Sequence, residues 1–291
     1  MRDYNKFIEN SRKWLAKYIE DNHLQSIIIG ISGGIDSTIS CAIAYPVCKK
    51  LGIPLIGRSL PTFTNKEDET NVANLVGDAF CNDYKEVSIE ELYSKFVNEL
   101  EVNEEKMTPL QLGNIKARIR MIYLYNLASI NKGCVLDTGN KTEHEIGFFT
   151  IHGDVGDLNC GLIHLWKTEI YELADYLLEE LYSDKDVDIA MKKYQALLES
   201  VRLTPTDGNG VSSSDCEQFG LDNYKQVDDV LVTMYYRSGF EQAFSSNSDQ
   251  YSRLIDDYNE QGVDKVMALH QNTEFKRKPA PIMPTREELE L

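Results

Sequence analysis

Residues 25–38, QSIIIGISGGIDST, are the stretch that decides the fold. Residues 25–31 are short, continuously apolar and rich in β-branched side chains, which is typical of a strand buried inside a parallel sheet. Residues 32–34, Ser-Gly-Gly, can turn the chain tightly, and residues 37–51 have the pattern of a helix that Pro46 would bend. A strand, a tight loop and a helix in this order predict an anion site, because the loop amides lie next to the helix N-terminus.

Asp36 follows the glycines, at a place where its negative charge would face the anion. The Gly-x4-Gly-Lys-Ser/Thr pattern of a Walker A loop is absent, so no lysine of this loop neutralises a bound phosphate. A Mg²⁺ ion can do so, because it takes oxygen ligands from one or two carboxylates and from phosphates. We therefore expect Asp36 to be a metal ligand; the alternative is a carboxylate that only stabilises the helix dipole.

The rest of the chain predicts strands that alternate with helices. We expect further strands at 52–61, 84–89 and 133–140, an amphipathic helix near the N-terminus, and helices at 65–80, 90–100, 109–131, 167–182, 186–200, 222–238 and 251–272. This alternation predicts an α/β fold, a Rossmann-like open parallel sheet flanked by helices. The loops after Ile31, Leu60 and Leu136 should then gather at the carboxyl edge of the sheet, where ligands bind in such folds.

We expect one domain over residues 1–291, with its core at about 5–272 and a C-terminal tail at 273–291. Residues 204–220, TPTDGNGVSSSDCEQFG, are rich in Thr, Ser, Gly and Asp. A stretch of this length without secondary structure is usually a mobile loop or a lid, which is the prediction for these residues.

The composition limits the classes of function. The chain has 47 acidic and 30 basic residues and a net charge of −17, which disfavours binding to a long nucleic acid. The six cysteines form no CxxC pair, so neither a zinc cluster nor a disulfide framework is expected. No long apolar run predicts a membrane span, and the charged N-terminus lacks the apolar segment of a signal peptide. We therefore expect a cytoplasmic protein without a nucleic-acid or membrane partner.

The full string Ser-Gly-Gly-Ile-Asp-Ser at 32–37 resembles the loop of the PP-loop ATP pyrophosphatases, in the adenine nucleotide alpha hydrolase-like superfamily. Those enzymes cleave ATP between the α and β phosphates and adenylate a substrate. Four later strings resemble the ammonia-dependent NAD synthetases: GNIKARIRM (113–121), TGNKTEHEIGFFTIHGD (138–154), LWKTEIYELADYL (165–177) and TEFKRKPAP (273–281). This resemblance spans residues 5–285, nearly the whole chain.

The resemblance implies a homodimer of α/β subunits, with Mg²⁺ as cofactor and ATP as co-substrate. The nicotinate carboxylate of deamido-NAD would attack the α-phosphorus of ATP, giving an adenylated intermediate and pyrophosphate. Ammonia would then attack the acyl carbon and release AMP and NAD, so the chain would be a ligase that forms a C–N bond. Only 29 residues precede Gly30, so we expect no glutaminase domain, and ammonia that is free or supplied by another protein.

The resemblance also assigns the site residues. Asp36 and Glu143 would hold the metal and, with Lys167, act as the catalytic residues. ATP would be bound by Gly30, Ile31, Ser32, Gly33, Gly34, Ile35, Asp36, Ser37, Arg58, Thr138, Lys167 and Thr206. Deamido-NAD would be bound by Arg118, Asp157, Phe275 and Lys276.

The chain departs from the family pattern around the second substrate. Phe275 stands where the family has His, Ile151 stands where it has Lys, and Asp157 matches an acidic position only across a one-residue gap. We therefore expect an intact adenylation site and an altered pocket for deamido-NAD. One alternative is another PP-loop ligase that amidates or thiolates its substrate. The other is a nucleotide-binding regulator without catalysis, against which Asp36 and Glu143 argue.

Overall fold

The computed structural model describes residues 3–100, 107–182, 187–206, 214–236 and 249–278. Five parallel strands form one sheet in the order β3-β2-β1-β4-β5. They are β1 (Ser26–Gly30), β2 (Leu55–Ser59), β3 (Asp83–Glu86), β4 (Gly133–Asp137) and β5 (Leu158–Asn159). The predicted Rossmann-like parallel sheet is confirmed. The short β5 was not predicted, because two residues give no periodic signal.

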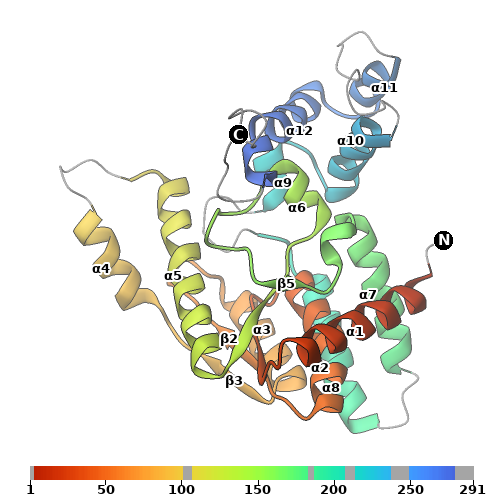
Figure 1. Cartoon of the computed structure of the whole chain (residues 1–291). Coiled ribbons are helices and arrows are strands. Elements are labelled where there is room, and N and C mark those ends of the chain that lie inside the picture. Colours follow the sequence, from red (N-terminus) through yellow and green to blue (C-terminus); the bar gives the residue numbers. More distant parts are fainter. Residues whose placement is uncertain (1–2, 101–106, 183–186, 207–213, 237–248, 279–291) are drawn as a thin grey trace, which may run out of the picture.

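Helices cover both faces of the sheet, because successive side chains of a strand point to opposite faces (Figure 1). Ile27 and Ile29 of β1 pack in a core with α1 (Tyr4–Asp21), α2 (Ile35–Leu51), α3 (Glu67–Phe80), α7 (Lys167–Tyr182) and α8 (Val187–Arg202). Ile28 of β1 points to the other face and packs near α5 (Pro109–Ile130), against which α4 (Glu90–Leu100) packs. The alternation in one apolar strand therefore places a core on each side.

A separate core joins helices from the later part of the chain. They are α6 (Lys141–Ile146), α9 (Asp215–Phe219), α10 (Tyr224–Tyr236), α11 (Asp249–Asp257) and α12 (Glu260–Asn272). Ile146, Trp166, Phe219, Val227 and Val263 are buried together in this core. Figure 1 shows these helices at one end of the molecule, where α6 contacts α10 and α12. Thus α6, which follows β4 closely in the chain, links the sheet to the second core. Two 3₁₀ helices, η1 (Leu162–His164) before α7 and η2 (Glu274–Arg277) after α12, are not part of this core; Leu162 of η1 is buried in the core of α1, α2 and α7.

Some predicted helices differ in detail. The helix predicted at 251–272 is two helices, because the side chain of Asn259 accepts a hydrogen bond from the Gly262 amide (2.7 Å) and starts α12 anew. The helix after β1 begins at Ile35 and continues through Pro46 to Leu51.

Part of the segment predicted as a lid, 204–220, is helical. α9 starts after the N-cap Ser214 and ends at Gly220, which has a left-handed φ of 75°. Residues 207–213 lie outside the described part of the chain, as do 237–238 of the predicted helix and 279–291 of the predicted tail. That the segment is a lid, and that residues 1–291 form one domain, stay predictions.

In the part of the chain that the structure describes, no helix combines the length and the apolar character needed to cross a membrane. All six cysteines are free thiols, and four of them are buried: Cys41, Cys48, Cys134 and Cys160. This agrees with the prediction that the cysteines do not form a disulfide framework.

Candidate active site

A cavity of about 810 Å³ lies at the carboxyl edge of the sheet, between the loops that follow β1 and β4. The strand order reverses between these two strands, and open α/β sheets bind ligands at such a point. The lining includes the loop after β1, most of residues 135–156 and the first residue of α7. The volume suits a small organic ligand. The cavity is therefore the place where the predicted site residues should meet.

The loop after β1 is shaped by contacts within and beneath it. Gly33 has a φ of 87°, and a Cβ at this position would lie 2.5 Å from the carbonyl oxygen of Glu69 in α3. Only glycine fits there, because the backbone is left-handed and there is no room for a side chain. The Gly34 amide donates to Ser32 Oγ (3.2 Å), and Ser37 Oγ donates to the Gly34 carbonyl (3.0 Å). The loop is thus held in shape at the N-terminus of α2 by its own serines.

Asp36, Glu143 and Lys167 come together beside this loop. Lys167 Nζ forms an ion pair with Asp36 Oδ2 and lies 3.4 Å from Glu143 Oε1. The Lys167 side chain is only 3% exposed, against 14% for Asp36 and 22% for Glu143. The three residues come from α2, α6 and α7, so the fold joins segments that are far apart in the sequence. The three side chains predicted to be catalytic are in direct contact.

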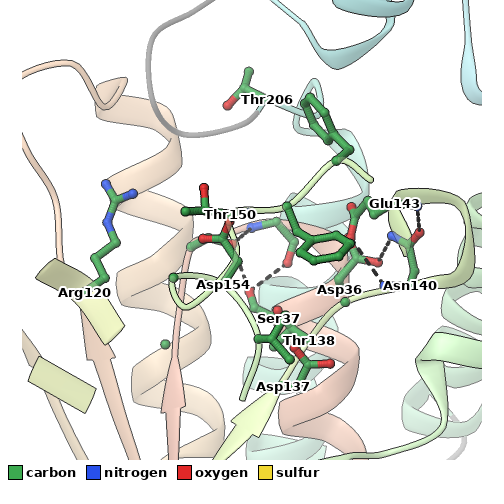
Figure 2. Close-up of a pocket in the computed structure, with 18 of the residues that line it drawn as sticks. Asp36, Ser37, Arg120, Asp137, Thr138, Asn140, Glu143, Thr150, Asp154 and Thr206 are labelled. Atoms are coloured by element: carbon green, nitrogen blue, oxygen red, sulfur yellow. Dashed lines mark hydrogen bonds between the residues drawn. The ribbon is translucent and has the colours of Figure 1, made fainter. Parts of the chain in front are cut away.

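Asn140, which is not among the residues predicted from the sequence, holds the two carboxylates in place. Its side chain is fully buried; its Nδ2 donates to Asp36 Oδ1 (3.0 Å), and its Oδ1 accepts from the Glu143 amide (3.0 Å). Its own amide donates to Glu143 Oε2 (3.3 Å), which completes a capping box at the start of α6. Figure 2 shows Asp36, Asn140 and Glu143 close together. The Asn-x-x-Glu pattern at 140–143 was the available signal, since it marks a capped helix.

Burial and neighbouring charges shift the pKa values of this group. Burial raises the pKa of Glu143 to about 8, with Lys167 opposing and Asp36 adding to the rise. Burial by itself lowers the pKa of Lys167, but the charges of Asp36 and Glu143 outweigh it and raise the pKa above its ordinary value. Lys167 is therefore a permanent cation at neutral pH.

The pair of carboxylates fits a divalent cation that is completed by a ligand. Both already approach one positively charged atom, Lys167 Nζ, so their oxygens converge on one place. Among the described residues there is no cluster of three or more Asp, Glu, His or Cys side chains that could hold a metal alone. Mg²⁺ does not need one, because it is usually bound by one or two carboxylates, substrate phosphates and water.

A buried network fixes the start of α7, where Lys167 stands. The Lys167 amide donates to Thr142 Oγ1 (2.8 Å), whose hydroxyl donates to Asp228 Oδ1 (2.5 Å). The Thr168 amide donates to the other oxygen of Asp228 (2.8 Å). A lysine at a helix N-terminus opposes the dipole, and the carboxylate of Asp228 compensates for this. Asp228 of α10 thus ties α6 and α7 together behind the catalytic residues.

Three other residues predicted to bind ATP, Thr138, Thr206 and Arg58, line the cavity but differ in the contacts of their side chains. Thr138 lines the cavity. Thr206 also lines it, and its hydroxyl donates to Glu69 Oε1 (2.6 Å). Arg58 lines it too, but its Nη2 forms an ion pair with Asp83 Oδ2 (2.9 Å), and its Nη1 donates to backbone carbonyls. The guanidinium of Arg58 is therefore used within the sheet.

The residues predicted for deamido-NAD do not all reach the cavity. Lys276 lines it, and its Nζ donates to the carbonyls of Gly147 (2.7 Å) and Phe149 (2.5 Å). Arg118, Asp157 and Phe275 are not part of the lining.

The contacts of these three residues lie elsewhere. Exposed Arg118 donates from Nε to the Ile151 carbonyl (3.4 Å), and the Phe275 side chain is 51% exposed. Asp157 Oδ2 accepts from the amide of Val135, the middle residue of β4 (2.8 Å). Their role in binding the substrate stays a prediction.

Arg120 and Asp154 line the cavity instead; in Figure 2, Asp154 lies between Arg120 and Asp36. Arg120 Nε donates to the Leu60 carbonyl (3.0 Å), and Asp154 Oδ2 accepts from the Thr150 amide (2.6 Å). Burial raises the pKa of Asp154, while hydrogen bonds from Thr150 and, to a smaller extent, the charges of Arg120 and Lys276 oppose the rise. Both residues belong to the strings that carry the resemblance, but the strings do not say which of their charges face the cavity.

Comparison with known proteins gives consistent matches. The chain matches the family model described as NAD synthase over residues 7–280. The NH(3)-dependent NAD(+) synthetase of Finegoldia magna is 32% identical over 231 residues, which cover 79% of this chain and 85% of that protein. The protein of the same name from Pyrococcus horikoshii is 30% identical over 289 residues, with coverages of 99% and 97%. The solved structure of NMN synthetase from Francisella tularensis has the same fold, with a TM-score of 0.73 at 22% identity over 98% of this chain and 100% of that chain.

Proposed function

Because this chain belongs to the NAD synthase family, we propose that it is a ligase that makes NAD from deamido-NAD, ATP and ammonia. AMP and pyrophosphate are the other products. The observation that carries this proposal is the contact of Asp36, Glu143 and Lys167 next to the glycine loop, at the point where the strand order reverses.

The first chemical step makes the carboxylate of deamido-NAD reactive. A carboxylate is a poor acyl donor, so its oxygen attacks the α-phosphorus of ATP, the bond to pyrophosphate breaks, and AMP becomes the leaving group. The barrier lies mainly in the charge on the phosphate oxygens, so positioning and electrostatics dominate. The amides of the loop after β1 bind the departing pyrophosphate at the N-terminus of α2.

Asp36 and Glu143 are the residues that would hold Mg²⁺, and the ion, when bound, supplies positive charge to the phosphates. Lys167 supplies a second positive charge from the protein. Asn140 and the network behind α7 keep these side chains aligned. Most of the rate enhancement then comes from charges that are in place before the reaction.

In the second step, ammonia attacks the acyl carbon of the adenylated intermediate. A C–N bond forms, the bond to AMP breaks, and the nitrogen loses a proton. We place the nicotinate end of the substrate toward Arg120, Asp154 and Lys276, which line the cavity. Arg118, Asp157 and Phe275 would contact the part of deamido-NAD that extends beyond this cavity.

The assay that tests the proposal supplies ATP, Mg²⁺, deamido-NAD and ammonium to the purified protein. Formation of NAD and AMP in equal amounts supports it. Pyrophosphate release without NAD formation would point to another PP-loop ligase. Tight ATP binding without pyrophosphate release would indicate a nucleotide-binding regulator without catalysis. A parallel reaction with nicotinic acid mononucleotide tests whether the chain shares the activity for which the Francisella protein is named.

We also propose that the protein acts as a homodimer. Ile122 and Ile130 on α5 are 53% and 69% exposed, which gives this helix an apolar outer surface near Arg118. Sedimentation equilibrium at several concentrations tests the assembly state, and a monomer at every concentration would contradict it. We place the protein in the cytoplasm, because six free thiols suit a reducing compartment.

A further inference from the structure

We propose that Lys167 is an exchangeable counter-ion: in the ligand-free protein it fills the cation position between Asp36 and Glu143, and it leaves that position when the metal–nucleotide complex binds. The proposal rests on the proposed function in one respect, the assignment of Asp36 and Glu143 as metal ligands. What it adds is that the protein itself competes with the metal for them.

The contacts of Lys167 carry the proposal. Its Nζ forms an ion pair with Asp36 Oδ2 and lies 3.4 Å from Glu143 Oε1. Both carboxylates thus direct an oxygen at the same ammonium group, whose side chain is only 3% exposed. An ammonium that bridges two partly buried carboxylates neutralises them without a metal, and a metal that binds both must displace it.

The surroundings supply more negative charge than one lysine can balance. Asp215 in α9 is 4% exposed and lines the same cavity, and its Oδ2 accepts a hydrogen bond from the Tyr224 hydroxyl (2.8 Å). Lys167 Nζ lies 5.1 Å from the centre of the Tyr224 ring. In the described part of the chain, three carboxyl groups, of Asp36, Glu143 and Asp215, therefore line the cavity together with the ammonium of Lys167. This excess of negative charge favours a further cation once Lys167 can turn elsewhere.

The neighbouring loop provides the place to which Lys167 can turn. The loop after β1 and the N-terminus of α2 would hold phosphates beside Asp36, so an ammonium on a flexible stem can exchange a carboxylate oxygen for a phosphate oxygen. Without nucleotide that exchange leaves a buried cation with fewer partners, which costs free energy. The consequence is an order of events: the metal binds weakly to the free protein and strongly together with ATP.

The test measures binding of Mn²⁺, a spectroscopic substitute for Mg²⁺, by the loss of the free-ion signal in electron paramagnetic resonance. No nucleotide is present in this first experiment. Lys167→Met should bind Mn²⁺ about tenfold or more tightly than the wild type, because an opposing charge within a few ångströms of the site is removed. Lys167→Arg keeps the charge and should bind as weakly as the wild type.

Lys141→Met is the matched control. It removes one positive charge two residues from Glu143, but Lys141 Nζ lies over the Trp166 ring (4.2 Å to its centre), whereas Lys167 Nζ pairs with Asp36 and Glu143. Its affinity for Mn²⁺ should match that of the wild type. A gain in Lys141→Met as large as that in Lys167→Met would mean that only net charge matters, which overturns the proposal.

Thermal unfolding gives a second measurement. Mg²⁺ without nucleotide should raise the Tm of Lys167→Met, because a ligand that binds the folded state stabilises it, and should leave the Tm of the wild type unchanged. Circular dichroism verifies that the variant is folded, and Lys167→Gln replaces it if it is not. Wild-type protein that binds Mn²⁺ as tightly without nucleotide as with a non-hydrolysable ATP analogue would overturn the proposal without any variant.

The failure of this proposal is distinct from that of the proposed function. If the wild type binds Mn²⁺ with the ATP analogue but Lys167→Met gains no affinity without it, the exchange is overturned and the metal site stands. If Mn²⁺ fails to bind even with the analogue, the metal assignment itself falls and the exchange falls with it. The NAD-forming assay is independent of both results.

Discussion

At one end of the cavity, Asp36, Glu143 and Lys167 pair with one another, whereas at the other end Arg120 and Lys276 donate to backbone carbonyls. The first arrangement concentrates charges that can be redirected to a charged ligand. In the second arrangement, Arg120 and Lys276 already donate hydrogen bonds to backbone carbonyls, so fewer of their N–H groups remain to bind a ligand. The first end therefore suits the binding of phosphates and a metal, and the second suits the orientation of a substrate.

The largest effect is expected from removing one of the two carboxylates at the first end of the cavity. Asp36→Asn and Glu143→Gln should each lower kcat for NAD formation by about 10²–10³-fold, because each removes one of two carboxylates that hold the positive charge. NAD and AMP formation at saturating ATP measures it. Glu67→Gln, at an exposed position in α3, is the control and should behave as wild type. Full activity in either site variant would refute the metal assignment.

A smaller effect tests how the first end is aligned. Asn140→Ala should lower the free energy of unfolding by about 1–2 kcal/mol, because α6 loses its N-cap. It should also lower kcat/KM by about 10–100-fold, because Asp36 loses its donor.

Asn140→Ser separates the two roles of Asn140, since serine can cap a helix but offers no Nδ2 to Asp36. Urea unfolding and steady-state kinetics on both variants make the comparison. Recovery of stability without recovery of activity supports the alignment role. Recovery of both would show that the contact with Asp36 is dispensable.

Substitutions at the second end of the cavity should change the KM for deamido-NAD but not the KM for ATP. Arg120→Met and Lys276→Met should each raise the KM for deamido-NAD about tenfold, as expected for the loss of a charged hydrogen-bonding group, and leave the KM for ATP unchanged. Initial rates with one substrate varied at a time measure both values. A rise in the KM for ATP would mean that the two ends of the cavity do not work separately.

Arg118→Met distinguishes two positions for the substrate. The family resemblance implies that Arg118 binds deamido-NAD, whereas Arg120 is the arginine of α5 that lines the cavity. An effect in Arg118→Met alone would place the substrate outside the cavity. Arg202→Met, at an exposed position on α8, is the control.

The smallest effect concerns the support behind Lys167. Burial raises the pKa of Asp228 from 3.8 to about 6, although hydrogen bonds from Thr142 and Thr168 oppose the rise. The folded state then holds a proton that the unfolded state has lost, so the contribution of Asp228 to stability falls as pH rises through this range. Relative to Asp228→Asn, the free energy of unfolding of the wild type should fall by about 1–3 kcal/mol between pH 4 and pH 7. Urea unfolding across this range measures it, and a constant difference would contradict the pKa shift.

Much of the fold follows from local patterns. The apolar run at 26–30 formed β1 and the glycine loop followed it, because burial and turn geometry depend on neighbouring residues. The break between α11 and α12 depends on the side chain of Asn259, which a helical pattern does not resolve. The two-residue strand β5 exists only because β4 lies beside it.

In the candidate site too, some features follow from local sequence patterns and others depend on tertiary packing. The residues predicted to be catalytic meet: Asp36 is identified from the loop string at 32–37, and Glu143 and Lys167 are identified from the strings at 138–154 and 165–177. Arg118 and Arg120 are two residues apart on α5, and a two-residue step turns a helix by more than half a circle. Which of them faces the cavity depends on how α5 packs on the sheet.

The sequence by itself determined the class of fold, the glycine loop and the family, because each rests on residue types at fixed spacing along the chain. Only the tertiary structure decided that Lys167 stands between Asp36 and Glu143, that Asn140 joins them, and that Arg120 lines the cavity. These contacts join segments separated by up to 131 residues, as between Lys167 and Asp36. Strand order and helix packing set such contacts, and neither leaves a signal in any single stretch of the sequence.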